Sequence, residues 1–192
     1  MLWPFNQFSK PRGAPRGTIE AIYGMIVTQA REPVFYRELG VADTVNGRFD
    51  LLLLHLWMVL RRFRSADGAA EVSQALFDHF CADMDANLRE MGVGDLAVPK
   101  RMQAFGEAFY GRGAAYDAAF ADDEALALAF CKNVLNGEGM ENARRLATYA
   151  KRMLAHLDRV DDAALLAAAW TFPAPVDACE SHSSRVVADE DS

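Results

Sequence analysis

The side chains best suited to metal binding lie close together in one stretch of the sequence. They are Asp78, His79, Cys81, Asp83 and Asp85. His79 and Asp83 are four residues apart, so a helix would place them on the same face. A closed zinc site needs four ligands, and the sequence has no second group of His or Cys residues that would complete one. A solvated acidic helix face therefore explains this cluster better than a metal site does.

The other candidates for catalysis lack the neighbours that their chemistry requires. His55 lies inside an apolar segment, where a hydrogen-bonded core histidine is more common than a base or a ligand. No His has a Glu three residues before it, which argues against a carboxylate-bridged di-iron site. Gly92-Val93-Gly94 resembles part of a dinucleotide fingerprint, but it follows a predicted helix and not a strand. With no nucleophile motif or phosphate-binding loop either, the sequence predicts no catalytic, cofactor-binding or metal-binding residues.

Charged residues beside turn-forming residues suit a different chemistry, the binding of a partner. They occur in segments 43–50 and 89–95 and directly after Pro99. Two interpretations stay open, because an Arg beside a turn either docks a partner or holds a nearby carboxylate of its own chain. We expect Lys100 to be a surface residue and at least one of Arg48 and Arg89 to be structural. The candidate partner or client surface consists of Asp43, Arg48, Asp50, Arg89, Glu90, Asp95, Lys100 and Arg101.

The composition predicts a globular domain. The chain has 192 residues, of which 52% are hydrophobic and 24% charged, so it can bury a core without disulfides or a structural metal. Its formal net charge of −7 argues against direct nucleic-acid binding, which normally needs a basic surface. Three Cys residues are too few for a disulfide scaffold, and a reducing compartment is the simplest inference.

Apolar residues recur at helical spacing along most of the chain, and no segment alternates with a period of two. The fold class is therefore predicted to be all-α, a single bundle-like domain of six to eight helices. In the central helix, Leu53, Leu56 and Leu60, or the set offset by one, should be buried. Gly111 and Gly113 should break or bend a later helix. The predicted helices are 19–31 capped by Thr18, 33–39 ended by Gly40, 48–63 after a loop at 41–48, 71–91 ended by Gly92, 99–116, 123–136 capped by Asp122 or Asp123, 143–157, and 163–170 capped by Asp161 or Asp162.

The two ends of the chain differ from its middle. Residues 1–17 are predicted to be a flexible basic and aromatic arm, 18–174 the helical domain, and 175–192 a disordered acidic tail. Aromatic residues beside basic ones suit weak contact with an anionic membrane surface, and an arm that is disordered or packed on the domain is the alternative. The arm residues concerned are Trp3, Phe5, Phe8, Lys10, Arg12 and Arg16. The apolar run at 49–60 is too short to span a bilayer, which needs about twenty residues.

Two long stretches of sequence are similar to one protein family. They are REPVFYRELGVADTVNGRFDLLLLHLWMVLRRFR (31–64) and ALFDHFCADMDANLREMGVGDLAVPKRMQAFGEAFYGR (75–112), in which DTVNGRFD and NLREMGVGD are the most specific strings. On these residues the chain resembles the ubiquinol–cytochrome c chaperone family, bacterial relatives of a mitochondrial factor that assists biogenesis of the cytochrome bc complex. The resemblance covers most of residues 18–120, is general after Tyr116 and is absent from both ends. The family pattern includes Asp43, Gly47, Arg48, Asp50, Arg89, Glu90, Gly92, Gly94, Asp95 and Lys100, none of them a catalytic residue of the family.

The resemblance implies an all-α assembly chaperone without catalysis or a cofactor. The related mitochondrial factor binds newly made cytochrome b and the ribosome that makes it, together with a small partner protein. We therefore expect a cytoplasmic protein, peripheral to the inner membrane, that binds an apolar helical client such as cytochrome b in a helix-in-groove mode. The alternative function is a helical protein that binds a small molecule or haem near His55 or His79.

Overall fold

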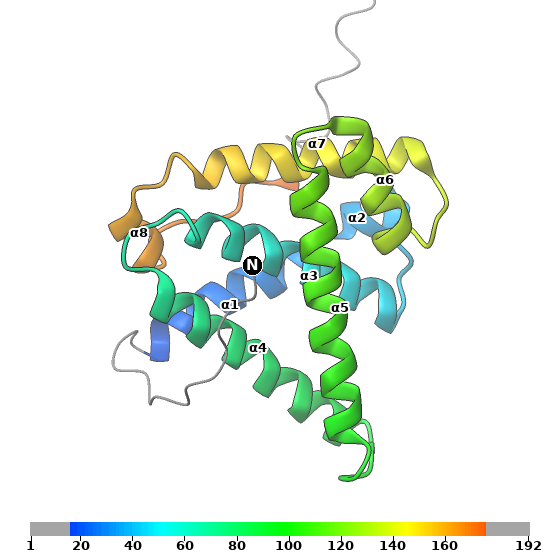
Figure 1. Cartoon of the computed structure of the whole chain (residues 1–192), viewed down its shortest axis with the longest axis vertical. Coiled ribbons are helices and arrows are strands. Elements are labelled where there is room, and N and C mark those ends of the chain that lie inside the picture. Colours follow the sequence, from blue (N-terminus) through cyan, green and yellow to red (C-terminus); the bar gives the residue numbers. More distant parts are fainter. Residues whose placement is uncertain (1–15, 176–192) are drawn as a thin grey trace, which may run out of the picture.

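Eight helices account for most of residues 16–175, the part of the chain that this computed structural model describes (Figure 1). No strand occurs in that part, so the all-α prediction is confirmed. The helices are α1 (Arg16–Ala30), α2 (Pro33–Arg37), α3 (Val45–Phe63), α4 (Ala70–Glu90), α5 (Val98–Ala119), α6 (Asp123–Val134), α7 (Met140–Leu157) and α8 (Asp162–Leu166).

The helix α3 lies at the centre of the bundle and contacts α1, α4, α5, α6 and α7. Side chains on all of its faces are buried, as its nearly continuous apolar sequence predicts. Leu53 and Leu56 are at most 1% exposed and Leu54 is fully buried, whereas Leu60 is partly exposed. The prediction of a buried central helix is therefore confirmed.

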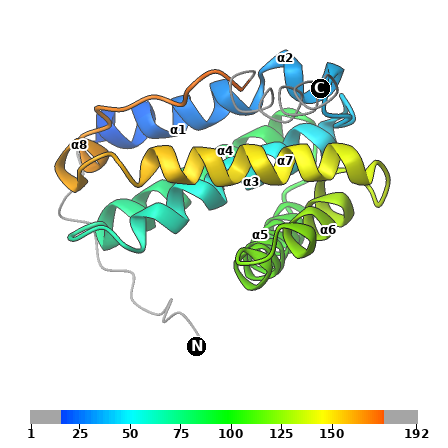
Figure 2. The ribbon, with the colours of Figure 1, turned by 90° about the horizontal axis from the view of Figure 1, so that it is seen from above.

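The long helix α5 extends along the longest axis of the molecule, and α7 crosses near its C-terminal end (Figure 1). The connection between α4 and α5 consequently lies at the far end of the molecule from α7. Seen from above, α1 lies on one side of α7 and α5 and α6 pack together on the other, while α3 and α4 pass underneath α7 (Figure 2). The end of α4, the α4–α5 connection and the start of α5 (residues 89–101) therefore form a projecting end of the molecule, which we call the hairpin end.

The beginning of α3 differs from the prediction. The helix starts at Val45 rather than at Arg48, because the Thr44 hydroxyl caps it by accepting the backbone N–H of Gly47 at 3.2 Å. Gly47 therefore lies in the first turn and not in a loop. A Cβ at this position would come within 2.0 Å of the carbonyl oxygen of Ala42, so close approach of two backbone segments explains the glycine.

Two other helix predictions also need correction. The helix α5 runs without interruption through Gly111 and Gly113. Gly113 faces the Trp57 ring, and a glycine inside a helix costs only about 1 kcal/mol, which the packing of α5 outweighs. The first helix begins by Arg16, so Thr18 lies inside it and is not its cap. In the structure, Asp122 caps α6 and Asp161 caps α8, so in each case the first of the two predicted residues is the cap.

The segment after α8 is extended and lies against the bundle instead of continuing the helix to Trp170. The helix stops at Leu166, and Ala168 has a left-handed φ of 58°. Trp170 is buried, and its indole N–H donates to the carbonyl of Leu165 at 3.1 Å. The carbonyl of Pro173 accepts a hydrogen bond from Gln29 at 3.2 Å, which ties this segment to α1.

Most of the predicted arm and tail lie outside the described residues. Trp3, Phe5, Phe8, Lys10 and Arg12 are among them, as are residues 176–192. Arg16 belongs instead to α1, where it pairs with Glu20 at 3.0 Å. Within residues 16–175, no helix combines the length and the apolar character needed to cross a bilayer.

Candidate functional site

The acidic cluster on α4 serves the packing of α1 against α4. The Tyr23 hydroxyl donates to Asp83 at 2.7 Å, and the Tyr23 ring meets the His79 ring edge-on at 4.9 Å. Burial, together with Asp78, raises the pKa of the Cys81 thiol to about 11, so this cysteine is protonated at neutral pH. Among residues 16–175, no three His, Cys, Asp or Glu side chains lie close enough together to hold a metal ion.

His55 is fully buried in a hydrogen-bond network. Its Nδ1 donates to the carbonyl of Leu51 at 2.7 Å, which leaves Nε2 to accept the Tyr149 hydroxyl at 2.7 Å. Gln29 in turn donates to the Tyr149 oxygen at 3.1 Å. Burial lowers the pKa of His55 to about 4, so the ring is neutral at physiological pH. With both ring nitrogens engaged, His55 is the hydrogen-bonded core histidine that its apolar surroundings predict, and it offers no free nitrogen to a haem iron.

At the start of α3, Asp43 and Arg48 form an ion pair at the surface. The guanidinium Nε lies 2.8 Å from the Asp43 carboxylate, and both side chains are more than half exposed. Arg48 also lies over the Tyr36 ring, 5.2 Å from its centroid. An exposed pair of this kind contributes about 0–1 kcal/mol, so these two side chains remain available to a partner.

Asp50 lies in the interior rather than at a partner surface, which corrects its place among the candidates. It is 6% exposed and forms an ion pair with Arg112 of α5 across 2.7 Å. Burial raises the pKa of Asp50, and the Arg112 charge opposes this rise. Asp50 follows Arg48 by two residues, which is about half a turn of helix. Its side chain therefore points to the opposite face of α3, towards the interior. Asp50 therefore joins α3 to α5.

The α4–α5 hairpin end holds the other five candidates. Arg89 contacts Asp85 at 2.6 Å and Asp95 at 2.5 Å, so it holds the loop against the end of α4. Its arrangement matches the structural alternative, in which an Arg clamps a neighbouring carboxylate. Glu90, Lys100 and Arg101 are exposed.

The sequence analysis did not identify two exposed apolar residues at the hairpin end as candidates. Leu96 is 99% exposed and Met91 is 62% exposed, among the most exposed large hydrophobic side chains of residues 16–175. Their sequence signal was weak, because a single Leu or Met in a loop is common on protein surfaces. They become candidates for partner binding because they lie at the projecting end of the molecule, beside Lys100 and Arg101. The eight candidates thus divide between the start of α3 and the hairpin end and do not form one site.

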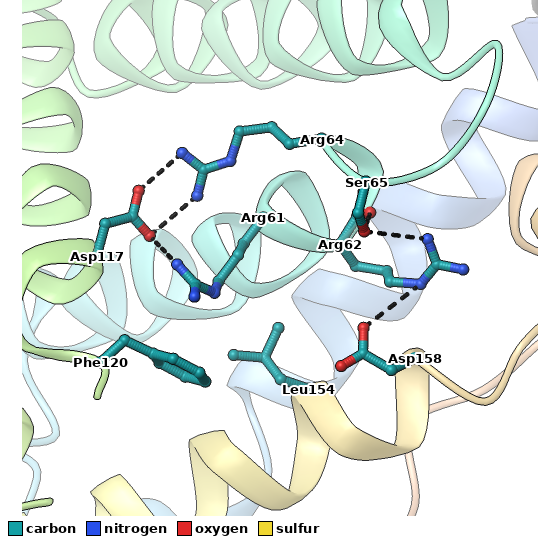
Figure 3. A pocket seen from close by; sticks show the side chains of 8 residues that line it. All are labelled: Arg61, Arg62, Arg64, Ser65, Asp117, Phe120, Leu154 and Asp158. Carbon is teal, nitrogen blue, oxygen red and sulfur yellow. Dashed lines mark hydrogen bonds and ion pairs between the residues drawn. The ribbon is translucent and has the colours of Figure 1, made fainter. Parts of the chain in front are cut away.

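A pocket that the sequence did not indicate lies between α3, α5 and α7. We call it the arginine pocket; it has a volume of about 460 Å³ (Figure 3). From the sequence, Arg61, Arg62 and Arg64 were interpreted only as the end of the apolar run. Nothing near them in the sequence indicates which helix they face. The residues that line it are Arg61, Arg62, Arg64, Ser65, Asp117, Phe120, Leu154 and Asp158.

Asp117 of α5 is the acceptor on which one side of this pocket converges. Arg64 binds both of its carboxylate oxygens, at 2.7 and 2.9 Å, and Arg61 binds at 2.5 Å (Figure 3). The Trp57 indole N–H adds a bond at 3.0 Å. Partial burial raises the pKa of Asp117, but the bonds from Arg64, Trp57 and Arg61 outweigh it and hold the pKa below its usual range. This carboxylate is therefore ionised at physiological pH.

On the other side of the pocket, Arg62 is a buried clamp at 7% exposure. Its guanidinium donates to the carbonyl of Leu157, the last residue of α7, at 3.1 Å and to that of Val160, just after α7, at 3.0 Å. It also binds Asp162 at 2.7 Å, at the start of α8. Arginine supplies the several planar donors that such a junction needs. Arg62 therefore fixes α3, α7 and α8 to one another.

Residues 37–172 match a known protein family, described as ubiquinol-cytochrome C chaperone. The chain belongs to this family. The match includes both groups of candidate surface residues and the whole arginine pocket. It confirms the resemblance that the segments around DTVNGRFD and NLREMGVGD indicated.

Individual relatives agree with the family assignment. The structure is similar to the crystal structure of the Cbp3 homolog from Brucella abortus, with 34% sequence identity and a TM-score of 0.77 over 85% of this chain and 92% of that one. The sequence is 28% identical over 137 residues to ubiquinol-cytochrome-c reductase complex assembly factor 1 of Xenopus laevis, covering 69% of this chain and 68% of that protein. The assembly factors 1 of Mus musculus and Homo sapiens are equally similar, but the match spans only 46% of each.

Proposed function

We propose that this chain is a non-catalytic chaperone in the assembly of ubiquinol–cytochrome c reductase. The observation that carries the proposal is its membership of the ubiquinol-cytochrome c chaperone family over residues 37–172. Relatives of similar sequence are named as assembly factors of that complex, and the structural similarity covers 85% of this chain and 92% of the Brucella abortus homolog. The buried histidine network and the ion pairs fit a scaffold whose polar groups are used to hold helices together.

The client that fits this proposal best is an apolar helical protein, and cytochrome b is the one that the family resemblance implies. A ribosome or a small partner protein would be further partners, and the site of action would be the cytoplasmic face of the inner membrane. Contact of the arm residues with that membrane is compatible with this location.

The α4–α5 hairpin end is the surface that we assign to the client. It presents Leu96 and Met91 to solvent at the projecting end of the molecule, where an apolar helix can reach them. The flexible, unbranched methionine side chain adapts to varied apolar partners. Lys100 and Arg101 border this apolar end, while Arg89 fixes its loop through Asp95. Arg48 and Asp43 at the start of α3 are the second contact region.

A substitution at Leu96 tests this assignment. Leu96→Asp should reduce recovery of cytochrome b in a crosslinking pull-down from cells that make the complex, because it places a charge in an apolar contact. Leu128→Asp is the matched control, since Leu128 is 63% exposed on α6 and lies outside the proposed surface. Both variants should melt like the unmodified protein, since surface changes are usually within about 0.5 kcal/mol.

Charge reversal separates the binding residues from the structural ones. Lys100→Glu should weaken capture without lowering the melting temperature, whereas Arg89→Glu should loosen the hairpin end that it holds. If Leu96→Asp and Lys100→Glu both capture cytochrome b as well as Leu128→Asp does, the hairpin end is not the client surface. If the unmodified protein captures no subunit of the complex, the chaperone assignment itself fails.

A further inference from the structure

The arginine pocket lies outside the surfaces assigned to the client. We propose that it binds a phosphate group, carried either by a free phosphate compound or by the headgroup of an anionic lipid. The binding atoms would be the guanidinium nitrogens of Arg61 and Arg64 at the C-terminal end of α3. This inference does not rest on the identity of the chaperone's client.

The first argument is an imbalance of charge. Arg61 and Arg64 share the single carboxylate of Asp117. The third arginine of the pocket has acids of its own, because Arg62 binds Asp162 at 2.7 Å and lies 3.6 Å from Asp158 (Figure 3). Two guanidinium groups facing one carboxylate leave an uncompensated positive charge on this side of the pocket, in a chain whose net charge is −7.

The second argument is a surplus of hydrogen-bond donors. Each arginine has five N–H groups, and within residues 16–175 the bonds to Asp117 use one from Arg61 and two from Arg64. The side chains are 29% and 41% exposed, so the remaining donors are accessible to a ligand. A phosphate group accepts from several directions at once and suits such planar donors.

The third argument is that the donors are held in place before any ligand arrives. The Arg61 guanidinium lies over the Phe120 ring, 4.0 Å from its centroid, and 5.8 Å from that of Trp57. Arg64 is fixed by its two bonds to Asp117. Groups that are already ordered lose little conformational freedom when they bind an anion.

The fourth argument is space and its lining. A volume of about 460 Å³ exceeds that of a phosphate ion and falls in the range of small-molecule sites. Phe120 and Leu154 form an apolar wall across the pocket from Arg64, against which the organic part of a phosphate ester can pack (Figure 3). Lys151 adds a cation near Phe120, although it pairs with Asp123.

The test is a titration of the full chain with two probes. Inorganic phosphate is titrated calorimetrically at constant ionic strength against a chloride blank, and sedimentation is measured with vesicles of phosphatidylglycerol in phosphatidylcholine against phosphatidylcholine alone. We expect saturable binding in at least one arm. Binding of phosphate in solution would identify a free phosphate compound as the ligand class, and binding only to anionic vesicles would identify a lipid headgroup. Absence of binding in both arms would overturn the proposal.

Variants decide whether the arginine pocket is the site. Arg61→Gln and Arg64→Gln should each weaken binding about tenfold, while Arg144→Gln, which removes an exposed arginine outside the pocket, should not. Asp117→Asn should strengthen binding, because it removes the competing negative charge and keeps an acceptor. Circular dichroism melting confirms that each variant is folded, and Arg64→Gln, at the more exposed position, carries the test if Arg61→Gln does not fold. The pocket would not be an anion site if Arg144→Gln weakened binding as much as the pocket variants do. The same conclusion would follow if a folded Asp117→Asn variant bound the anion more weakly than the unmodified protein.

Discussion

Acidification from pH 7 to pH 5 should destabilise this protein through the buried His55. In the folded chain, burial lowers the pKa of His55 to about 4, whereas in the unfolded chain it returns to about 6.5. Between these two values the unfolded state binds a proton that the folded state does not, so stability rises with pH across this window and is lost as pH falls from about 6.5 towards 4. Each unit of difference corresponds to about 1.4 kcal/mol, so lowering the pH from 7 to 5 should cost about 2 kcal/mol.

The assay is urea unfolding, followed by circular dichroism, at pH values between 5 and 7. His55→Gln removes the titrating ring and should flatten the pH dependence over this range. Tyr149→Phe is the matched variant, because it keeps the ring but removes the hydroxyl that donates to Nε2. It should lower the free energy of unfolding by about 1–3 kcal/mol at pH 7 while retaining the slope, since an unsatisfied buried acceptor is costly.

Other groups with shifted pKa values act elsewhere on the pH scale or in the opposite direction. The pKa values of Asp117 and Asp162 are lowered, so the stability that they contribute is present above the usual Asp value and is lost below it. The pKa of Asp50 is raised by burial, so protonation of this residue works against the His55 effect as pH falls. A slope between pH 5 and 7 that is the same in His55→Gln as in the unmodified protein would refute the reasoning.

Five further substitutions test the packing. Leu53→Ala and Leu56→Ala should each cost about 2–5 kcal/mol in urea unfolding, because both side chains are buried in the central helix, and negligible effects would show that α3 is peripheral. Gly47→Ala should destabilise the fold, since its Cβ has no room against the backbone of the preceding loop, whereas Gly111→Ala, with open space around it, should raise the melting temperature by helix propensity alone. Arg62→Met should lower the free energy of unfolding by about 1–3 kcal/mol, because it removes the buried donors that bind the carbonyls of Leu157 and Val160, and an unchanged melting temperature would exclude the clamp.

Much of the fold was predictable because helices are local structures. The spacing of apolar residues, the caps at Asp122 and Asp161 and the stop at Gly92 depend on neighbours within a few positions, which a sequence displays directly. The predictions failed where tertiary contacts decided the outcome. Gly113 suggested a break, but packing against Trp57 keeps α5 continuous.

The candidate site was harder to predict, because a charge in a sequence does not show which way it faces. Asp43 and Arg48 lie at the surface as expected, but Asp50, in the same specific string, is buried against Arg112. Leu96 could not be identified as a candidate from the sequence, because only the structure shows that it is exposed at the projecting hairpin end.

The sequence by itself determined the helical class, the buried central helix and the family, because these follow from local spacing and from strings of matched residues. Only the tertiary structure decided which distant side chains meet. Asp117 lies more than fifty positions after the two arginines that bind it, and Tyr149 lies ninety-four positions after His55. Such meetings depend on the angles and distances at which whole helices pack, which are set by the shapes of many side chains together. The arginine pocket, the neutral buried histidine and the projecting apolar end therefore emerge only when the helices are assembled.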